Sequence, residues 1–145
     1  MRAVCQRVSR GRVTVDDAKV AEIGRGLVVL LGVARDDTTA ESDRFAGKVA
    51  RLRVFEDEQG KFAHSLLDVG GAALVVSQFT LIADTGKGNR PSFVEAAPPD
   101  VAESLYERFA EQLAAAGVAA VERGRFGSRM KVELVNDGPV TIVLE

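Results

Sequence analysis

The sequence predicts one α/β domain that consists mostly of strands, with two long helices packed on one side. Two observations lead to this prediction: short strand-like apolar segments recur along the chain, and two longer segments carry apolar residues at helical spacing. The chain has 145 residues, of which 46% are hydrophobic and 28% charged. A domain of this length buries roughly 70% of the surface that its unfolded chain exposes. We therefore expect residues 1–145 to share a single core.

Most of the chain is expected to form strands. The predicted strands cover residues 2–8, 12–15, 18–23, 27–33, 54–55, 73–81 and 118–123, with two more runs between 130 and 144. The segment 27–33 is apolar throughout, which indicates a strand buried on both faces. Asp16 and Asp17 form a predicted turn, and residues 136–139 (Asn-Asp-Gly-Pro) are a turn signal between the last two runs.

The first predicted helix covers about residues 39–52. Phe45, Val49 and Leu52 recur at helical spacing, so they are expected to face the core. Thr38 is followed by Glu41 in the pattern of a capping box, in which each side chain would bond a backbone N–H at the start of the helix.

The second predicted helix begins after the pair Pro98 and Pro99. Asp100 is the expected N-cap, because its side chain can accept a hydrogen bond from an unpaired backbone N–H. The apolar stripe of this helix is formed by Val101, Leu105, Phe109 and Leu113. Gly117 follows the stripe and is expected to end the helix.

Several classes of protein are disfavoured by the composition. The apolar run 27–33 is much too short to cross a bilayer, so we expect a cytoplasmic protein with no membrane partner. Cys5 is the only cysteine and His64 the only histidine. No internal disulfide and no Cys/His metal cluster can therefore form, and we expect neither a metal nor a cofactor.

The charge distribution limits any contact with nucleic acid to local patches. The formal net charge is −2, which argues against a protein that coats itself in positive charge. Two clusters remain as candidates for RNA contact: Arg2, Arg7, Arg10 and Arg12 near the start, and Arg123, Arg125, Arg129 and Lys131 near the end. The simpler interpretation is that these charges are solvated and flank strands.

Residues 77–81 (Ser-Gln-Phe-Thr-Leu) place polar side chains in a predicted core strand. Buried polar groups need hydrogen-bond partners, so either Ser77 and Thr80 bond to nearby backbone or the segment lines a site. As a nucleophile, either hydroxyl would need a base, and only His64 could supply one. A thiol hydrolase built on Cys5 is the weaker alternative, because a cysteine in an apolar strand is usually buried and inert.

Two other glycine-containing segments are open to two interpretations. Gly138-Pro139 is either an ordinary turn or a rigid wedge whose carbonyls reject a ligand sterically. Phe126 and Met130 lie in a glycine-flanked segment, where they either line a pocket or close the core. Lys87 and Arg90 lie in a glycine-containing loop and are able to meet a phosphate.

Together these segments resemble the D-aminoacyl-tRNA deacylase family over the whole chain. The residues that carry the resemblance are 6–8 (Gln-Arg-Val), 32–33 (Gly-Val), 76–81 (Val-Ser-Gln-Phe-Thr-Leu), 90–93 (Arg-Pro-Ser-Phe) and 135–141 (Val-Asn-Asp-Gly-Pro-Val-Thr). The motifs at 76–81 and 135–141 are each weak alone, but their occurrence together and in this order is highly specific. One departure is His64, which stands where the family usually has asparagine.

The resemblance implies mixed and antiparallel sheets in a barrel-like arrangement, and a homodimer with its two active sites at the interface. Each site would be completed by the partner's Gly138-Pro139, a cis dipeptide in the family, whose carbonyls exclude an L side chain and capture the α-amino group. Arg7 matches the arginine that holds this dipeptide. Ser77, Gln78, Phe79 and Thr80 match the strand that lines the catalytic site, and Phe126 and Met130 match positions around the terminal adenosine.

The implied activity is hydrolysis of D-aminoacyl-tRNA, a proofreading step of translation that rejects L-aminoacyl-tRNA and uses tRNA, not DNA. Glycyl-tRNA, such as glycine mischarged on tRNA-Ala, should also be cleaved, because a pocket that excludes L side chains cannot reject glycine. No side-chain base is evident, so we expect oxyanion stabilisation by backbone N–H groups around Gln78 and Phe79. The ribose 2′-hydroxyl is the family's proposed helper, and Thr80 as a covalent nucleophile is the alternative.

Two other functions stay open at this point. The first is a hydrolase of small esters or peptides that uses Ser77 or Thr80 as its nucleophile. The second is a non-catalytic dimeric tRNA-binding module that depends on the arginine clusters, and it would bind RNA with a steep dependence on salt.

Overall fold

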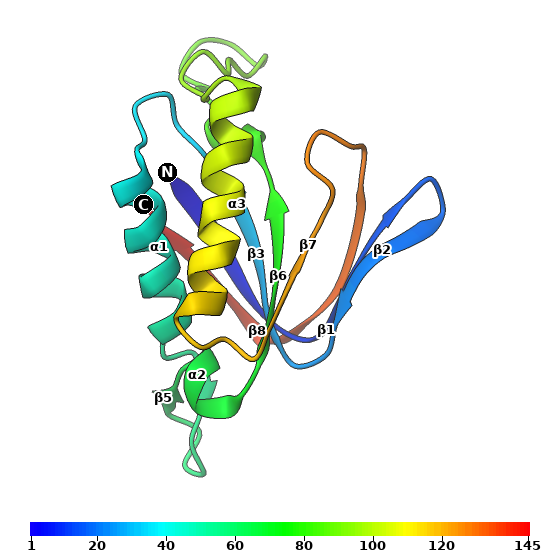
Figure 1. Ribbon diagram of the computed structural model, residues 1–145, viewed down its shortest axis with the longest axis vertical. Coiled ribbons are helices and arrows are strands. Elements are labelled where there is room, and N and C mark those ends of the chain that lie inside the picture. The colour runs from blue at the N-terminus through cyan, green and yellow to red at the C-terminus, as the bar shows by residue number, and fades with distance from the viewer.

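The long strand β1 (Arg2–Val15) organises the sheet of the computed structural model, which describes all residues 1–145. Its first half pairs antiparallel with β3 (Gly26–Gly32) and its second half with β2 (Ala18–Ile23). Along its other edge runs β8 (Lys131–Leu144), also antiparallel. The sheet continues from β3 through parallel pairs to β6 (Ala72–Ser77) and β7 (Ala120–Arg123). It is mixed and nearly closed, as predicted (Figure 1).

The two long helices lie together on one side of this sheet (Figure 1). They are α1 (Thr39–Arg51) and α3 (Pro99–Ala115), and both agree with the predicted spans. The remaining elements are the short helix α2 (Leu66–Val69), the 3-10 turn η1 (Phe79–Leu81) and a two-stranded sheet of β4 (Phe55–Glu56) and β5 (Phe62–His64). No helix of the chain is both long enough and apolar enough to cross a bilayer.

The central strands are buried on both faces, as their apolar character predicted. On one face Leu27, Val29 and Leu31 of β3 pack with the helices in the larger core. On the other face Val28 packs with Leu74 and with residues of β1 and β2 in a smaller core, inside the curl of the sheet. Successive side chains of a strand point to opposite faces, so a continuous apolar run fills two cores at once.

Polar contacts also join the two long helices. Arg108 of α3 donates two hydrogen bonds to the carboxylate of Asp43 of α1, at 2.6 and 2.7 Å. The buried Ser42 hydroxyl donates to the Leu105 carbonyl at 2.9 Å. These contacts fix how α3 lies on the sheet, and the first turn of α3 forms one wall of the cavity described below.

Several predicted strand boundaries were wrong. The runs 2–8 and 12–15 form one strand, and so do the two runs between 130 and 144. Register shifts near Val8 let both strands continue their pairing past the residues that were predicted to separate the runs. Conversely, the predicted strand 73–81 ends at Ser77, where the chain leaves the sheet.

The helix caps also differ from the prediction, although the helices do not. Thr38 precedes α1, but its side chain makes no capping hydrogen bond. At α3 the N-cap is Pro98 and not Asp100, because Pro99 already occupies the first turn, where a fixed φ suits proline. Gly117 follows the last residues of α3 with φ +104°, so the predicted helix end is confirmed.

Candidate active site

A cavity of about 570 Å³ is lined by residues at the end of β6 and in the first turn of α3. Figure 1 shows that these two ends lie toward the same end of the molecule. Five of the residues predicted for the site lie in the cavity wall: Ser77, Gln78, Phe79, Phe126 and Met130. The other lining residues are mainly apolar: Val33, Val76, Phe93, Ala96, Ala97, Pro99, Ala102, Gly127, Ser128 and Val132. The cavity therefore has the character of a small-molecule site, with an apolar wall and a few polar groups at one end.

The polar end of the cavity forms where the chain leaves β6. The Gln78 N–H still donates to the Leu31 carbonyl at 2.8 Å, as the last bond of the sheet. The 3-10 turn that follows is closed by bonds from Leu81 N–H to the Gln78 carbonyl, 3.2 Å, and from Ile82 N–H to the Phe79 carbonyl, 2.9 Å. The N–H groups of Phe79 and Thr80 lie outside these bonds, as the first N–H groups of a helical turn do.

This geometry corrects one expectation from the sequence. The Gln78 N–H is predicted there to stabilise an oxyanion, but it is used by the sheet, so the free donors at this end are those of Phe79 and Thr80. The Gln78 side chain bonds instead to the Thr80 hydroxyl. Thr80 itself is exposed at the rim and is not part of the cavity wall.

The close approach of two segments explains Gly32. A Cβ at this position would lie 2.9 Å from the Leu81 Cβ and 3.0 Å from the Gln78 carbonyl oxygen. Any side chain would therefore push the 3-10 turn away from β3. Gly32 lets the turn pack directly against the strand, which holds the Phe79 and Thr80 N–H groups in place.

Aromatic side chains form opposite parts of the cavity wall. Phe79 and Phe93 meet edge to face with ring centroids 5.2 Å apart. Phe79 is nonetheless 54% exposed, which is unusual for a side chain of its size. On the other side, Phe126 packs against Tyr106 of α3 at 5.9 Å. The cavity wall thus contains one exposed aromatic ring, Phe79, and one half-buried ring, Phe126, which packs against Tyr106.

Tyr106 ties three elements together beside the cavity. Its hydroxyl lies 3.1 Å from the Val75 carbonyl of β6 and 3.3 Å from the Gly124 carbonyl, where the loop with Phe126 begins. Burial, with a smaller contribution from Glu107, raises the pKa of this hydroxyl to about 12. The hydroxyl therefore stays protonated as a donor and fixes the start of the 124–130 loop. Sequence reasoning missed this residue; its position on the apolar stripe of a helix was the only signal.

Arg7 is the buried centre of a second cluster, on the β8 side of β1. Its guanidinium donates to the Asp137 carbonyl at 3.0 Å, to the Val54 carbonyl at 2.8 Å and to the Glu56 carboxylate at 3.2 Å. Arg7 is only 6% exposed, so these contacts also compensate for the burial of a charge. Arg7 thus contacts the residue directly before Gly138-Pro139.

The segment around Gly138 is held at both ends. The Asn136 side chain accepts a hydrogen bond from the Val140 N–H at 3.1 Å and donates one to the Thr141 hydroxyl at 3.0 Å. Gly138 has φ +128°, and a Cβ there would lie 2.9 Å from the Arg7 Nη2. Only glycine fits this conformation and this contact without strain. The Gly138-Pro139 peptide bond is cis, and both residues are exposed.

Gly138-Pro139 lies far from the cavity of its own chain. Arg7 is paired with Leu27 and through it with Ala73, whereas the cavity begins three residues further along β6, at Val76. Three strand spacings of about 4.8 Å and three residues of about 3.3 Å separate the two along the sheet, roughly 17 Å in all. One chain therefore does not bring all the predicted site residues together.

The structure supports neither a serine or threonine nucleophile activated by His64 nor a nucleophilic Cys5. His64 lies in β5 of the separate small sheet, exposed and paired with Phe55, and takes no part in the cavity wall. Cys5 is buried in the larger core, where burial raises the pKa of its thiol to about 12. A thiol with that pKa does not supply a thiolate at neutral pH.

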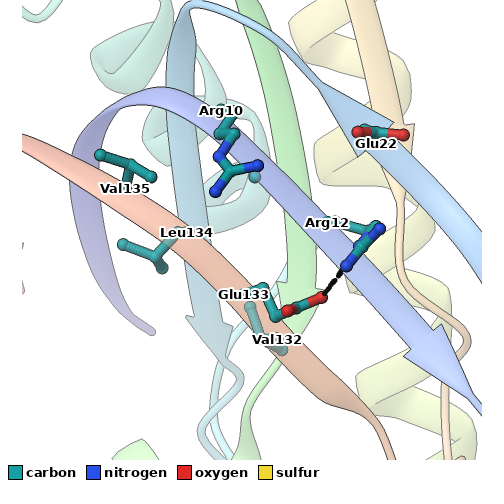
Figure 2. Close-up of a pocket in the computed structure, with 8 residues that line it drawn as sticks. Arg10, Arg12, Glu22, Val132, Glu133, Leu134 and Val135 are labelled. Carbon is teal, nitrogen blue, oxygen red and sulfur yellow. Dashed lines mark hydrogen bonds and ion pairs between the residues drawn. The ribbon is translucent and has the colours of Figure 1, made fainter.

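A second hollow of about 440 Å³ lies on the exposed surface of β1 and β8 (Figure 2). It is lined by Arg10, Gly11, Arg12, Glu22 and residues 132–135. Figure 2 shows the ion pair between Arg12 and Glu133, in which the two side chains approach to 2.6 Å. Charged side chains, Arg10, Arg12, Glu22 and Glu133, make up half of its lining residues, which distinguishes this hollow from the mainly apolar cavity at β6.

Comparison with known proteins identifies the family of the chain. Residues 4–145 match the family model described as D-Tyr-tRNA(Tyr) deacylase. The chain belongs to this family. A protein of Ruegeria pomeroyi named D-aminoacyl-tRNA deacylase is 60% identical over 145 residues, which is all of this chain and 99% of that protein. A protein of the same name from Roseiflexus castenholzii is 59% identical over all of this chain and 92% of its own length.

Solved structures are similar as well. The structure of a c-Myc DNA unwinding element binding protein is 46% identical to this chain, with a TM-score of 0.94 over 100% of this chain and 98% of that one. A structure of a probable eukaryotic D-amino acid tRNA deacylase has the same fold at 21% identity, with a TM-score of 0.87 over 99% of this chain and 97% of that one. The predicted fold class and family are thus confirmed.

The contacts of Arg7 predict a large effect on stability. Arg7→Met removes all three hydrogen bonds and leaves the buried Val54 carbonyl without a donor, so we expect the free energy of unfolding to fall by about 2–4 kcal/mol. Urea denaturation measures this loss, and hydrogen exchange should become faster in residues 136–141. The matched control is Arg12→Met, whose exposed ion pair should contribute little. Equal stability of the two variants would contradict the role of Arg7.

Proposed function

We propose that this chain is a D-aminoacyl-tRNA deacylase, which hydrolyses the ester between a D-amino acid and the 3′ end of a tRNA. The products are the free D-amino acid and the tRNA, and the role is proofreading of translation in the cytoplasm. The observation that carries the proposal is the family match over residues 4–145. The cavity supports it independently, since an apolar pocket with free N–H groups at one end suits a nucleoside ester.

Catalysis in this proposal depends on position and on backbone donors. An aminoacyl ester is already activated, so a water molecule needs little further help to attack it. The free N–H groups of Phe79 and Thr80 are the donors for the oxyanion that forms at the ester carbonyl, and a good donor of this kind contributes roughly 3–4 kcal/mol. The substrate's 2′-hydroxyl assists, and Ser77 and Gln78 position the reacting end of the substrate within the cavity wall.

The remainder of the cavity would hold the terminal adenosine. Phe126 and Met130 form its inner wall, and Phe79 offers an exposed ring at the mouth. Bases stack on aromatic faces with about 1–3 kcal/mol for each base. Adenosine binding would thus align the ester with the Phe79 and Thr80 N–H groups.

A second copy of the chain would complete the site. Gly138-Pro139 is exposed, held by Arg7 and remote from its own cavity, so it is available to enter the cavity of a partner. Exposed apolar side chains on β8 support a homodimer: Val132, Val135 and Val143 are among the few large hydrophobic side chains on the surface. Burial of such side chains is a common source of dimer stability.

In this arrangement D-aminoacyl esters are selected because L side chains are excluded. In the proposal, the partner's Gly138-Pro139 occupies the space that an L side chain would need, and its carbonyls accept hydrogen bonds from the α-amino group. A D side chain points away from the wedge. Selection of this kind is steric, so it needs no side chain that recognises a particular amino acid.

The first test compares D-tyrosyl-tRNA with L-tyrosyl-tRNA, using the purified protein without added metal. We expect the D-ester to be lost at least about 100-fold faster than the L-ester, because the wedge acts only on the L side chain. Survival of both esters would overturn the proposed activity and favour a tRNA-binding module. Equal cleavage of both would indicate a less selective esterase.

A second prediction concerns glycine, which has no side chain to exclude. Glycyl-tRNA, including glycine carried by tRNA-Ala, should be cleaved under the conditions that cleave D-tyrosyl-tRNA. L-alanyl-tRNA is the matched control, since it differs by one methyl group and should survive. Complete resistance of glycyl-tRNA would mean that the cavity recognises a D side chain directly.

A third prediction tests the wedge itself. Pro139→Ala removes the ring that makes the wedge rigid, so its carbonyls are no longer held where they exclude an L side chain. Cleavage of L-tyrosyl-tRNA should rise by about 10-fold or more while D-tyrosyl-tRNA is still cleaved. Urea denaturation and sedimentation should find the variant folded and still dimeric. Unchanged rejection of the L-ester in such a variant would count against the role of Gly138-Pro139.

A further inference from the structure

Two loops that adjoin the cavity carry positive charges that the proposed mechanism does not use. We propose that these cations bind the backbone phosphates of the single-stranded RNA that leads to the terminal adenosine. They lie in two loops: Lys87 and Arg90 in the loop that follows η1, and Arg125 and Arg129 in the loop between β7 and β8. This inference rests on the proposed function, since it assigns a binding surface to the part of the tRNA that lies outside the cavity.

The ion pairs of the chain distinguish these residues from the N-terminal arginine cluster. In the N-terminal arginine cluster, Arg7 is buried, Arg12 pairs with Glu133, and Arg2 pairs with Glu145. That cluster is thus largely neutralised within the fold, and Arg10 is its one member without an ion pair.

The cations at the mouth differ from that cluster. Arg123, at the end of β7, is paired with Glu107, but Arg125 and Arg129 make no ion pair and their side chains make no hydrogen bond. The same holds for Lys87 and Arg90, and all four of these side chains are exposed. Charges that the fold leaves unpaired are the ones available to a ligand.

The first loop is built to project from the cavity rim. Asp84 and Ser92 close its base with two backbone hydrogen bonds, at 2.8 and 2.9 Å, and Phe93 follows directly in the cavity wall. The Asp84 carboxylate accepts a hydrogen bond from the Gly86 N–H at 2.8 Å, so this acid is engaged by the loop itself. Lys87 and Arg90 therefore lie on a closed loop next to the aromatic ring at the mouth.

The second loop presents its cations between residues of the cavity wall. Phe126, Ser128 and Met130 line the cavity, whereas Arg125 and Arg129 are exposed. The Tyr106 hydroxyl holds the Gly124 carbonyl at the start of this loop, so the position of Arg125 is tied to the cavity wall. Both pairs of cations thus lie in segments that adjoin the same cavity: Phe93, directly after the first loop, is in its wall, and so are Phe126, Ser128 and Met130 of the second loop.

The chemistry of the substrate accounts for this distribution. The cavity is mainly apolar, so it suits the adenosine and the aminoacyl group but not a chain of phosphates. The RNA must leave through the mouth, and its next phosphates then lie at the rim. The net charge of −2 gives no general attraction for RNA, so the attraction has to come from local cations.

Binding of tRNA that carries no amino acid tests the inference without any need for catalysis. Two variants, Lys87→Gln with Arg90→Gln and Arg125→Gln with Arg129→Gln, each remove two positive charges. The matched control is Lys48→Gln with Arg51→Gln, which removes two charges from the surface of α1. Kd is measured for each across a range of salt concentrations.

We expect each rim variant to weaken tRNA binding by about 10-fold or more at low salt. It should also reduce the slope of log Kd against log salt by about 1.4, that is, about 0.7 for each single-strand phosphate that the variant no longer neutralises. The control should match the wild type. Wild-type binding in both rim variants, or an equal loss of affinity in the control, would overturn the inference.

A second measurement separates this inference from the proposed activity. D-tyrosyl-adenosine ester carries no phosphate, so the rim variants should lose at least about 10-fold more of kcat/KM on D-tyrosyl-tRNA than on this small ester. Equal losses on both substrates would overturn the inference. If the wild type cleaves neither ester, the proposed activity fails, and the tRNA-binding slopes still decide whether the rim holds RNA.

Discussion

The curl of β1 is the constraint on which the rest of the structure depends. One strand pairs with β3 in its first half, with β2 in its second half and with β8 along its other edge. That path closes the smaller core and turns the other face of β3 and β6 toward the helices. It also places Arg7 several residues away, along the strand direction, from the ends of β3 and β6 where the cavity lies. Both halves of the proposed site follow from it.

The chemistry proposed for the cavity needs rigid positioning more than it needs reactive side chains. The only histidine lies in another sheet, and the only thiol is buried with a raised pKa. What the fold supplies instead is a backbone turn at the end of β6, held against Gly32 and fixed by the last bond of the sheet. Donors fixed in this way do not have to reorganise when charge develops on the substrate.

Electrostatics divides the arginines of this chain into structural and available groups. Arg7 stabilises the segment before Gly138 from within, where its charge is compensated by two carbonyls and Glu56. Arg12 and Arg108 join neighbouring elements as ion pairs. The exposed cations in the two loops beside the cavity have no such partners, and in our proposal they bind RNA phosphates. The same residue type serves three purposes because burial and neighbours differ.

The sequence by itself determined most strands of the main sheet, the two long helices and the resemblance to the family, because apolar periodicity and the motifs at 76–81 and 135–141 are local properties of the chain. It did not determine where strands merge, that Pro98 and not Asp100 caps α3, or that Gln78 gives its N–H to Leu31. Each of those features depends on which distant segment of the chain packs or pairs next to the residue concerned. The separation of Gly138-Pro139 from the cavity depends on this as well. Pairing between distant segments is decided by the register of the sheet, which only the tertiary structure reveals.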